Sequence, residues 1–173
     1  MEASQYVDST LRIVHHLHEE AGAVRAVVQA YLRRTYADTE ALCEARIPVR
    51  LVKGAYKEPA SIAFEQKAEV DAEFVRILHL LLDRGVHPAL ATHDDELVEE
   101  TISYAAANGR PKDGFEFQML YGIRRDLQDR LVHDGYRLRL YVPYGEAWYP
   151  YFMRRLAERP ANLIFLARNL VRR

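Results

Sequence analysis

Residues 48–93 read PVRLVKGAYKEPASIAFEQKAEVDAEFVRILHLLLDRGVHPALATH, and this stretch decides the fold class. It opens with a short, largely apolar run at residues 48–56 and closes with another at residues 87–93. Between the two runs, apolar residues recur at helical spacing: Val70, Phe74, Ile77 and Leu81. This stripe, ended by Gly85, predicts an amphipathic helix that joins two strands. Neighbouring parallel strands need such a crossover, so the stretch predicts an α/β fold with a parallel sheet.

The same alternation extends along the rest of the chain. Further strands are predicted at three short apolar runs, residues 24–31, 115–120 and 137–142, and the tail of another at residues 1–4. Further helices are predicted at residues 7–17 with Gly22 as the C-terminal cap, at 41–45 with Asp38 as the N-cap, and at 98–105, 127–131, 148–159 and 163–171. No linker interrupts this pattern, so we expect one domain over residues 1–173.

Polar residues gather near the carboxyl ends of the predicted strands: Gln29, Lys53, Thr92, His93 and Gln118. A (βα)8 TIM barrel builds its active site at this edge. An open nucleotide-binding sheet would instead carry a glycine-rich phosphate loop, and the sequence contains neither a GxGxxG nor a GxxxxGK[ST] motif. The pattern therefore predicts a (βα)8 barrel. A full barrel takes about 250 residues, so we expect an incomplete one of about five βα units plus a C-terminal helix.

Composition excludes several classes of function. The 24 Lys and Arg against 25 Asp and Glu give a formal net charge of -1, so no overall attraction favours nucleic acid. One cysteine, Cys43, excludes an internal disulfide and a cysteine-based metal site, and it suits a reducing compartment. No signal peptide or membrane-spanning run is found, so we expect a cytoplasmic protein. No carboxylate completes a metal site with His15, His16 and His18, so no metal is expected.

Five strings, in order, carry a resemblance to a known family: QAY (29–31), RLVKGAY (50–56), ATHD (91–94), FEFQMLYGIR (115–124), and YVPYG (141–145) with YFMRRLAERPAN (151–162). Over nearly its whole length the chain resembles the catalytic domain of the proline dehydrogenases of the monofunctional bacterial type. The resemblance implies an FAD-dependent (βα)8 barrel that oxidises L-proline to Δ1-pyrroline-5-carboxylate and passes the electrons to a quinone. It also implies peripheral contact with the inner face of the membrane through the quinone, and a homo-oligomer is an open alternative to a monomer.

The strand-end residues suit a polar cofactor. Arg50 and Lys53 are cations inside an apolar strand, and a buried charge is costly unless it is paired, so they meet either a ligand or an internal partner such as Glu116. Neutral donors and acceptors of the kind that orient a flavin end other strands: Gln29, Thr92 and His93. The resemblance assigns cofactor contacts to Gln29, Arg50, Val52, Lys53, Gly54, Ala55, Thr92, His93 and Glu158. It gives Arg50 the catalytic position beside the flavin ring and leaves Gln118 a supporting role.

The last helical motif suggests a carboxylate site. Tyr151, Arg154 and Glu158 share one helix face, and Arg155 flanks it. Two neighbouring guanidinium groups can hold a carboxylate by bidentate hydrogen bonds. The alternative is an exposed pair between Arg154 and Glu158, worth about 0.3 to 0.5 kcal/mol. The resemblance favours the site: Arg154 and Arg155 bind the proline carboxylate, while Tyr141 and Tyr151 shape the pocket.

The resemblance also implies that part of the family's barrel is missing. The chain aligns from about the end of the family's third strand, so an active-site lysine on the first strand and an aspartate on the third have no counterpart. We therefore expect the 173-residue chain alone to bind FAD poorly, to oxidise proline slowly, and to associate through open sheet edges. Two alternatives remain: a truncated, noncatalytic half-barrel, or another flavin barrel such as a methylenetetrahydrofolate reductase relative, against which the double arginine followed by Glu158 argues.

Overall fold

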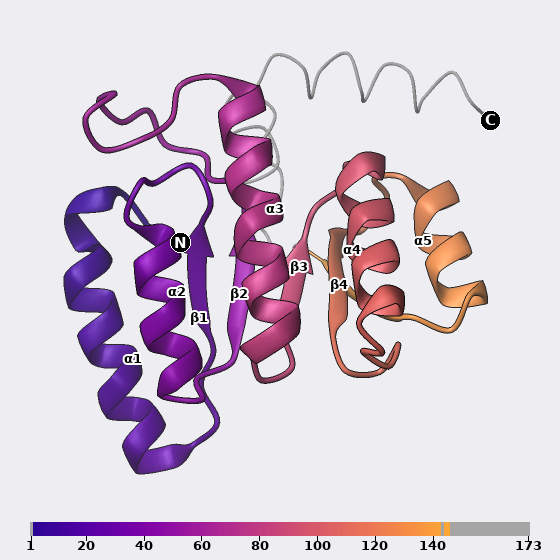
Figure 1. Ribbon diagram of the computed structural model, residues 1–173, viewed down its shortest axis with the longest axis horizontal. Helices are drawn as coiled ribbons and strands as arrows, with labels where there is room; N and C mark the ends of the chain where they lie inside the picture. The colour runs from indigo at the N-terminus through magenta and orange to yellow at the C-terminus, as the bar shows by residue number, and fades with distance from the viewer. Residues whose placement is uncertain (1, 143, 146–173) are drawn as a thin grey trace.

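The computed structural model describes residues 2–142 and 144–145. Helices and strands alternate along them in the predicted order (Figure 1). The strands are β1 (Ala26–Gln29), β2 (Val49–Val52), β3 (Ala89–Ala91), β4 (Glu116–Leu120) and β5 (Arg137–Tyr141). The helices are the 3-10 helix η1 (Ser4–Tyr6) and the α-helices α1 (Val7–Ala21), α2 (Thr35–Glu44), α3 (Lys67–Arg84), α4 (Asp95–Ala107) and α5 (Arg125–His133).

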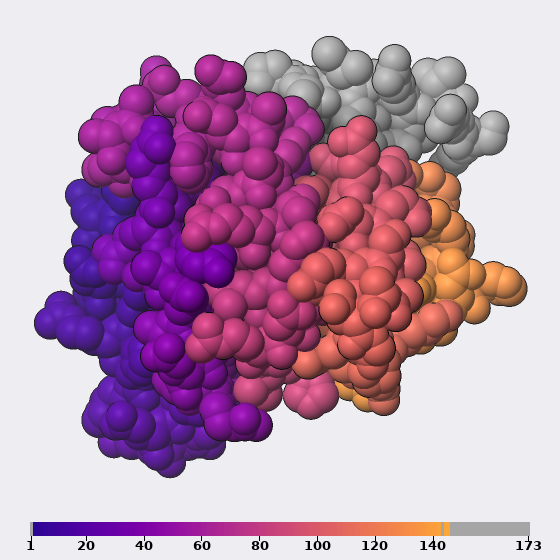
Figure 2. Space-filling model, viewed as in Figure 1, coloured from indigo at the N-terminus to yellow at the C-terminus, as the bar shows by residue number. Residues whose placement is uncertain are grey.

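The five strands form one parallel sheet whose spatial order is the order in the sequence. Their register joins apolar residues into a buried row: Val28, Leu51, Leu90, Phe117 and Leu138. Helices α2 to α5 cover this face of the sheet (Figure 1), and the segments follow one another across the surface in chain order (Figure 2). The predicted stripe of α3 packs here, because Phe74, Ile77 and Leu81 are each 0% exposed. The core therefore lies between the sheet and its helices.

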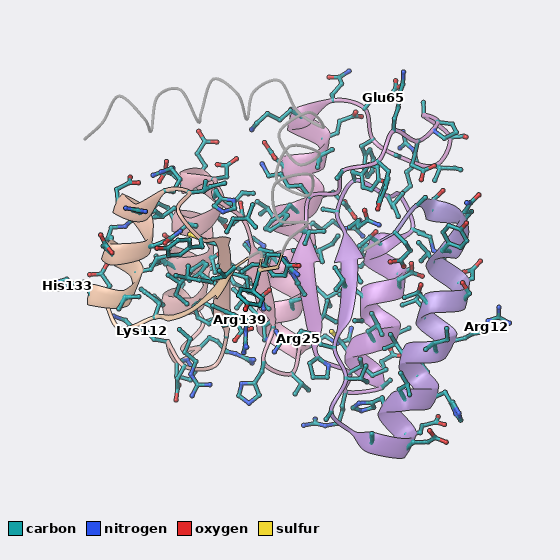
Figure 3. The ribbon with its side chains drawn as sticks, turned by 180° about the vertical axis from the view of Figure 1, so that it is seen from behind. Arg12, Arg25, Glu65, Lys112, His133 and Arg139 are labelled. Carbon is teal, nitrogen blue, oxygen red and sulfur yellow. The ribbon has the colours of Figure 1, made fainter. Side chains whose placement is uncertain are left out.

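The opposite face of the sheet carries the polar side chains of the strands among small and apolar ones. Side chains alternate between the two faces of a strand, so the residues next to the apolar row point the other way. Two registered rows lie on this face: Val27, Arg50, Ala89, Glu116 and Arg137, then Gln29, Val52, Ala91, Gln118 and Arg139. Figure 3 shows this side, and among the described residues no helix covers it. A curved parallel sheet with helices outside and polar groups inside has the layering of a barrel wall, and we call this the inner face.

Two details differ from the sequence-based expectations. Helix α2 begins at Thr35, so Asp38 lies in its first turn and is not the N-cap. Its carboxylate accepts a hydrogen bond of 2.7 Å from Arg34 Nε, one turn earlier. This bond stabilises an additional turn, which explains why the helix begins before the expected position. Residues 2 and 3 form no strand and Ser4 begins η1, so the strand tail predicted at residues 1–4 is wrong for its described part.

Other predictions hold at the ends of the helices. Gly22 follows α1 with φ of +66° and donates its N–H to the His18 carbonyl, as expected for a C-terminal cap.

Of the described helices, none is long and apolar enough to cross a membrane. The helices predicted at residues 148–159 and 163–171 lie outside the described residues.

Candidate active site at the carboxyl edge of the sheet

The strand register brings the predicted cofactor residues to one edge of the sheet. Gln29, the last residue of β1, lies beside Val52, the last residue of β2. Val52 lies beside Ala91, which ends β3 and is followed directly by Thr92 and His93. Because all strands are parallel, these residues and the loop that begins at Lys53 share the carboxyl edge, as the sequence predicts.

Gln29 presents a buried acceptor that has no partner among the described residues. Its side chain is 3% exposed, and its Nε2 donates to the Glu2 carbonyl at 2.9 Å. Its Oε1 is buried and accepts no hydrogen bond from the described residues. A buried polar atom without a partner is costly. The amide oxygen of Gln29 is therefore suited to a donor from a ligand or a water molecule.

Arg50 is half-buried on the inner face, in the same registered row as Glu116. The suggested internal partner Glu116 has other donors: Arg25 Nη1 at 3.3 Å, Gln118 Nε2 at 2.6 Å and Arg139 Nε at 3.1 Å. Burial alone would raise the pKa of Glu116, but these hydrogen bonds and charges hold it below its usual range. Glu116 is thus an ionised anchor of the inner face, and Gln118 is held by it.

The side chain of Lys53 turns toward the helices. Its ammonium lies 2.5 Å from Asp71 Oδ1 of α3 and 2.8 Å from Asp94 Oδ2 at the start of α4. Burial would raise the pKa of both carboxyl groups, but the hydrogen bonds and charge of Lys53, together with the nearby Lys67, outweigh it and lower both pKa values. The ion-pair alternative therefore describes the Lys53 side chain, with Asp71 and Asp94 in place of Glu116. The ammonium of Lys53 is thus engaged by protein carboxylates, and one of them, Asp94, directly follows Thr92 and His93.

Gly54 has a packing role that the sequence did not suggest. Its φ is +111°, and a Cβ built there would lie 2.1 Å from Cδ1 of Tyr31. The Tyr31 hydroxyl is buried without a partner among the described residues, and burial, with Glu58 and Tyr56, raises the pKa of Tyr31 to about 12. Glycine at position 54 therefore lets the loop that carries Ala55 close over the tyrosine ring.

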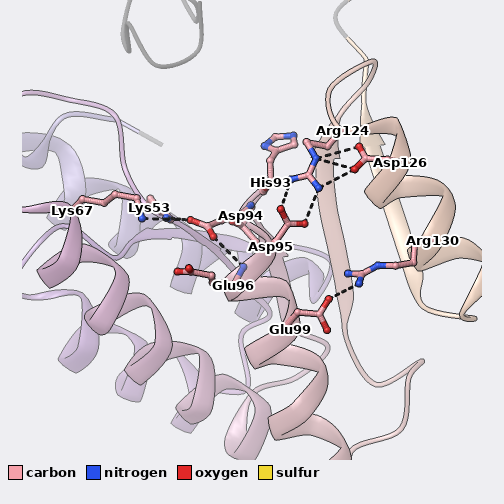
Figure 4. A network of polar contacts seen from close by, with 11 residues as sticks. Lys53, Lys67, His93, Asp94, Asp95, Glu96, Glu99, Arg124, Asp126 and Arg130 are labelled. Atoms are coloured by element: carbon pink, nitrogen blue, oxygen red, sulfur yellow. Dashed lines mark hydrogen bonds and ion pairs between the residues drawn. The ribbon is translucent and has the colours of Figure 1, made fainter. Parts of the chain in front are cut away.

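His93 is held as a neutral acceptor at one ring nitrogen. The backbone N–H of Leu120 donates to His93 Nε2 at 2.9 Å, so Nε2 carries no proton and the neutral ring bears its proton on Nδ1. Burial, aided by the nearby Arg124 cation, lowers the pKa of His93 to about 4. The neighbouring Thr92 Oγ1 accepts the Asp94 N–H at 3.1 Å. Figure 4 shows His93 and Asp94 together with Arg124, a residue to which the sequence assigned no role.

Of the predicted substrate residues, only Tyr141 is described. It ends β5 beside Leu120 of β4, at the same edge as His93, and is 48% exposed. The remaining predicted residues lie outside the described part of the chain: Tyr151, Arg154, Arg155 and Glu158.

The geometry suits recognition of an uncharged or anionic polar ligand. The amide oxygen of Gln29, which has no partner among the described residues, and the neutral imidazole of His93 lie at the carboxyl edge of the sheet. The guanidinium group of Arg50 lies on the inner face next to this edge. Among residues 2–142 and 144–145 no group of three or more His, Cys, Asp or Glu side chains is placed to hold a metal ion.

Comparisons with known proteins place the chain in a family. A family model described as "Proline dehydrogenase" matches residues 1–168. The proline dehydrogenase of Deinococcus radiodurans is 45% identical over 174 residues, which cover 99% of this chain and 56% of that protein. Proline dehydrogenase 2 of Bacillus subtilis is 44% identical over 173 residues, which cover 100% and 57%. The chain thus spans a little over half the length of these relatives.

A solved structure supports the same placement. Proline utilization A (PutA) from Bdellovibrio bacteriovorus, inactivated by N-propargylglycine, matches with a TM-score of 0.83 and 32% identity over 90% of this chain and 19% of that one. The expected α/β fold of the proline dehydrogenase barrel type is therefore confirmed, with five parallel strands and no closure of the barrel in the described residues. By its sequence along nearly its entire length and by its fold, this chain belongs to the proline dehydrogenase family.

Proposed function

We propose that this chain forms part of an enzyme that oxidises L-proline to Δ1-pyrroline-5-carboxylate, with FAD as cofactor and a quinone as electron acceptor. The observation that carries the proposal is the shared carboxyl edge of Gln29, Val52 and His93 in a chain of this family. The family match speaks against the methylenetetrahydrofolate reductase alternative.

The described residues fit a flavin. The buried Gln29 Oε1 accepts no hydrogen bond from them, and a flavin offers a ring N–H donor. The Nδ1–H of His93 is a donor for a ring acceptor, since Nε2 is occupied by Leu120. We assign the cofactor to Gln29, Arg50, Thr92, His93 and the backbone of residues 52–55. When bound, the flavin supplies the hydride acceptor for the oxidation.

The protein's own contribution is orientation and charge. Arg50 places a fixed positive charge on the inner face, where it stabilises negative charge that develops beside it. We propose that Lys53 acts through its backbone, because its ammonium is already held by Asp71 and Asp94. Arg154 and Arg155 would bind the proline carboxylate, Tyr141 and Tyr151 would shape the pocket, and Glu158 would reach the cofactor side. A cytoplasmic protein that meets the inner membrane face through its quinone fits this assignment.

Flavin binding and its response to proline test the proposal. The purified chain, together with the part of the Deinococcus radiodurans proline dehydrogenase that it does not match, is mixed with FAD, separated from the excess, and examined for the flavin band at about 450 nm. L-Proline, added without oxygen, should remove this band, whereas D-proline serves as the matched control. Arg50→Gln should weaken flavin binding and slow the bleaching, while Arg137→Gln, an exposed arginine in the same registered row, should leave both near the wild-type level.

Two outcomes would contradict the assignment. Equal flavin binding in wild type and Arg50→Gln would show that Arg50 does not bind the cofactor. A bound flavin that L-proline leaves oxidised would favour the noncatalytic half-barrel, the alternative to which the open sheet gives support.

A further inference from the structure

The loops that follow β3 and β4 hold one another by reciprocal hydrogen bonds. The His93 side chain accepts the N–H of Leu120, the last residue of β4, at 2.9 Å. In return, Arg124 Nη1 donates to the His93 carbonyl at 3.3 Å. The imidazole of one loop and the guanidinium of the other thus each bind the backbone of the opposite segment. Figure 4 shows His93 and Arg124 side by side.

Arg124 is itself fixed from two further sides. Its two terminal nitrogens each lie 2.7 Å from a different oxygen of Asp95, in the first turn of α4. Asp126, in the first turn of α5, accepts from Nη2 at 3.0 Å and from Nε at 3.2 Å. The backbone of Arg124 is left-handed, with φ of +57°, and its side chain is 17% exposed. Such a saturated guanidinium fork has little freedom to turn away from His93.

The carboxylates near His93 are bonded to cations and not to its ring. From α4, Asp95 is held by Arg124, whereas Asp94 is held by Lys53. From α5, Asp126 is also held by Arg124. No carboxylate in the described residues accepts a hydrogen bond from the His93 ring, so nothing there favours its protonation. Because Nε2 is taken by Leu120, Nδ1–H is the one donor that the ring can offer.

We propose that Arg124 is a positioning residue that holds the His93 loop and keeps the imidazole as an Nδ1–H donor toward the cofactor. The part that concerns the cofactor rests on the proposed function. The part that concerns His93 is a property of the chain itself and is tested without flavin.

The first test follows His93 by NMR in protein labelled with 15N-histidine, with His93→Gln used to assign its signals. In wild type the ring should stay neutral, with its proton on Nδ1, down to about pH 4. In Arg124→Gln the ring should titrate at a higher pH and lose the fixed tautomer, because the cation and the clamp on the loop are gone. Arg124→Lys keeps the cation but not the fork, so it should retain most of the low titration point while the tautomer signal broadens.

Arg130→Gln is the matched control. Arg130 also lies in α5 and pairs with Glu99 of α4 at 2.5 Å, but it has no contact with His93 (Figure 4). Its loss should leave the His93 signals unchanged. Circular dichroism shows which variants are folded, and if Arg124→Gln is not, the lysine variant carries the test. Identical His93 titration and tautomer signals in wild type and the folded Arg124 variants would overturn the proposal.

The second test measures FAD affinity by fluorescence quenching. Arg124→Gln should bind FAD about tenfold more weakly, the effect of misplacing one hydrogen bond, whereas Arg130→Gln should match wild type. Equal FAD affinity of wild type and Arg124→Gln, together with altered NMR signals, would overturn the link to the cofactor alone. These FAD measurements are made with the part of the Deinococcus radiodurans proline dehydrogenase that this chain does not match, added as a separate polypeptide. Absence of FAD binding in every variant under these conditions, wild type included, would count against the proposed function, and the NMR result would still decide the role of Arg124.

Discussion

Single residues at the carboxyl edge show how burial selects protonation states. His93 is buried beside a cation and receives a backbone N–H, and each of these three features disfavours the imidazolium. Lys53 shows the opposite case, since its ammonium lies between two carboxylates and helps to lower the pKa of both. Lys67 pairs with the same two carboxylates, so this ion cluster holds two cations and two anions. The site therefore combines a neutral ring with a charge-balanced ion cluster.

His93 should make folding stability sensitive to mild acid. Its pKa falls from 6.5 in the unfolded chain to about 4 in the folded one, so the unfolded state binds the proton first. The stabilisation is complete above pH 6.5 and is lost as pH falls toward 4, by roughly 3 kcal/mol in all. His93→Gln, whose Oε1 can still accept the Leu120 N–H, should lack this loss. Urea unfolding between pH 7.5 and 4.5 measures it, and equal slopes in both proteins would contradict the assignment.

Gly54→Ala should destabilise the protein by roughly 3 kcal/mol. At φ of +111° an L side chain is strained, and its Cβ would overlap the Tyr31 ring. Gly109→Ala is the matched control, because its φ of +67° also carries strain but nothing lies within 4 Å of the new Cβ. That change should cost about 1 kcal/mol. Thermal unfolding of both variants gives the comparison, and similar losses would show that the Tyr31 contact is unimportant.

The roles of single residues could be predicted from the sequence where local chemistry determines them. Two cations in an apolar strand require partners, and this reasoning correctly anticipated an internal ion pair for Lys53 as one alternative. The partners could not be found that way, because Asp71 and Asp94 lie on other elements and only the packing of α3 and α4 brings them near. Arg124 was overlooked for a similar reason, since its contacts reach back 29 and 31 residues in the chain.

At the scale of elements, helix ends connect the site to the scaffold. Asp94 is the N-cap of α4: its Oδ1 accepts the Glu96 N–H at 3.2 Å while its Oδ2 bonds Lys53 at 2.8 Å. One carboxylate thus begins a helix and ties it to the end of β2. Thr92 and His93 directly precede Asp94 in the chain, so the fixed start of α4 restricts the position of the loop that carries them.

Two substitutions at Asp94 should separate its two functions. Asp94→Asn keeps a cap acceptor but removes the charge opposite Lys53, whereas Asp94→Ala removes both. Both variants should be less stable than wild type, and the alanine variant should be about 1 kcal/mol less stable than the asparagine variant, the usual value of an N-cap. Urea unfolding at pH 7 provides the measurement. Equal stability of the two variants would show that the cap contributes nothing here.

Element positions followed from sequence periodicity more reliably than element ends did. The α3 stripe and the Gly22 cap of α1 were both correct, because apolar spacing and a left-handed glycine are local properties. The N-cap of α2 was placed four residues late, at Asp38 and not at Arg34, since the pair between Arg34 and Asp38 stabilises a turn that apolar spacing alone does not reveal. Strands were each predicted too long where polar residues leave the sheet, as after Val52.

At the scale of the whole molecule, the barrel assignment depended on polar residues at strand ends and on the missing phosphate loop. The structure adds the reason that the strands alternate: large apolar residues face the helices, while the inner face carries arginines, glutamines and Glu116 among small and apolar residues. An inner face of this kind is normally enclosed by further strands. In the described residues β1 and β5 each have a neighbour on one side only, so both edges of the sheet are open.

The open edges should make the isolated 173-residue chain self-associate and bind FAD weakly. Unpaired strand edges attract other strands, and a cofactor on the inner face would meet only part of its wall. Adding the part of the Deinococcus radiodurans proline dehydrogenase that this chain does not match, as a separate polypeptide, should lower self-association and raise both FAD affinity and proline oxidation.

The part that it does match is the control, because it duplicates strands already present and should not restore FAD binding or proline oxidation. Sedimentation velocity and the flavin band report the two effects. A monomeric, yellow chain that oxidises proline at the same rate with and without the added segment would show that the five-stranded sheet suffices.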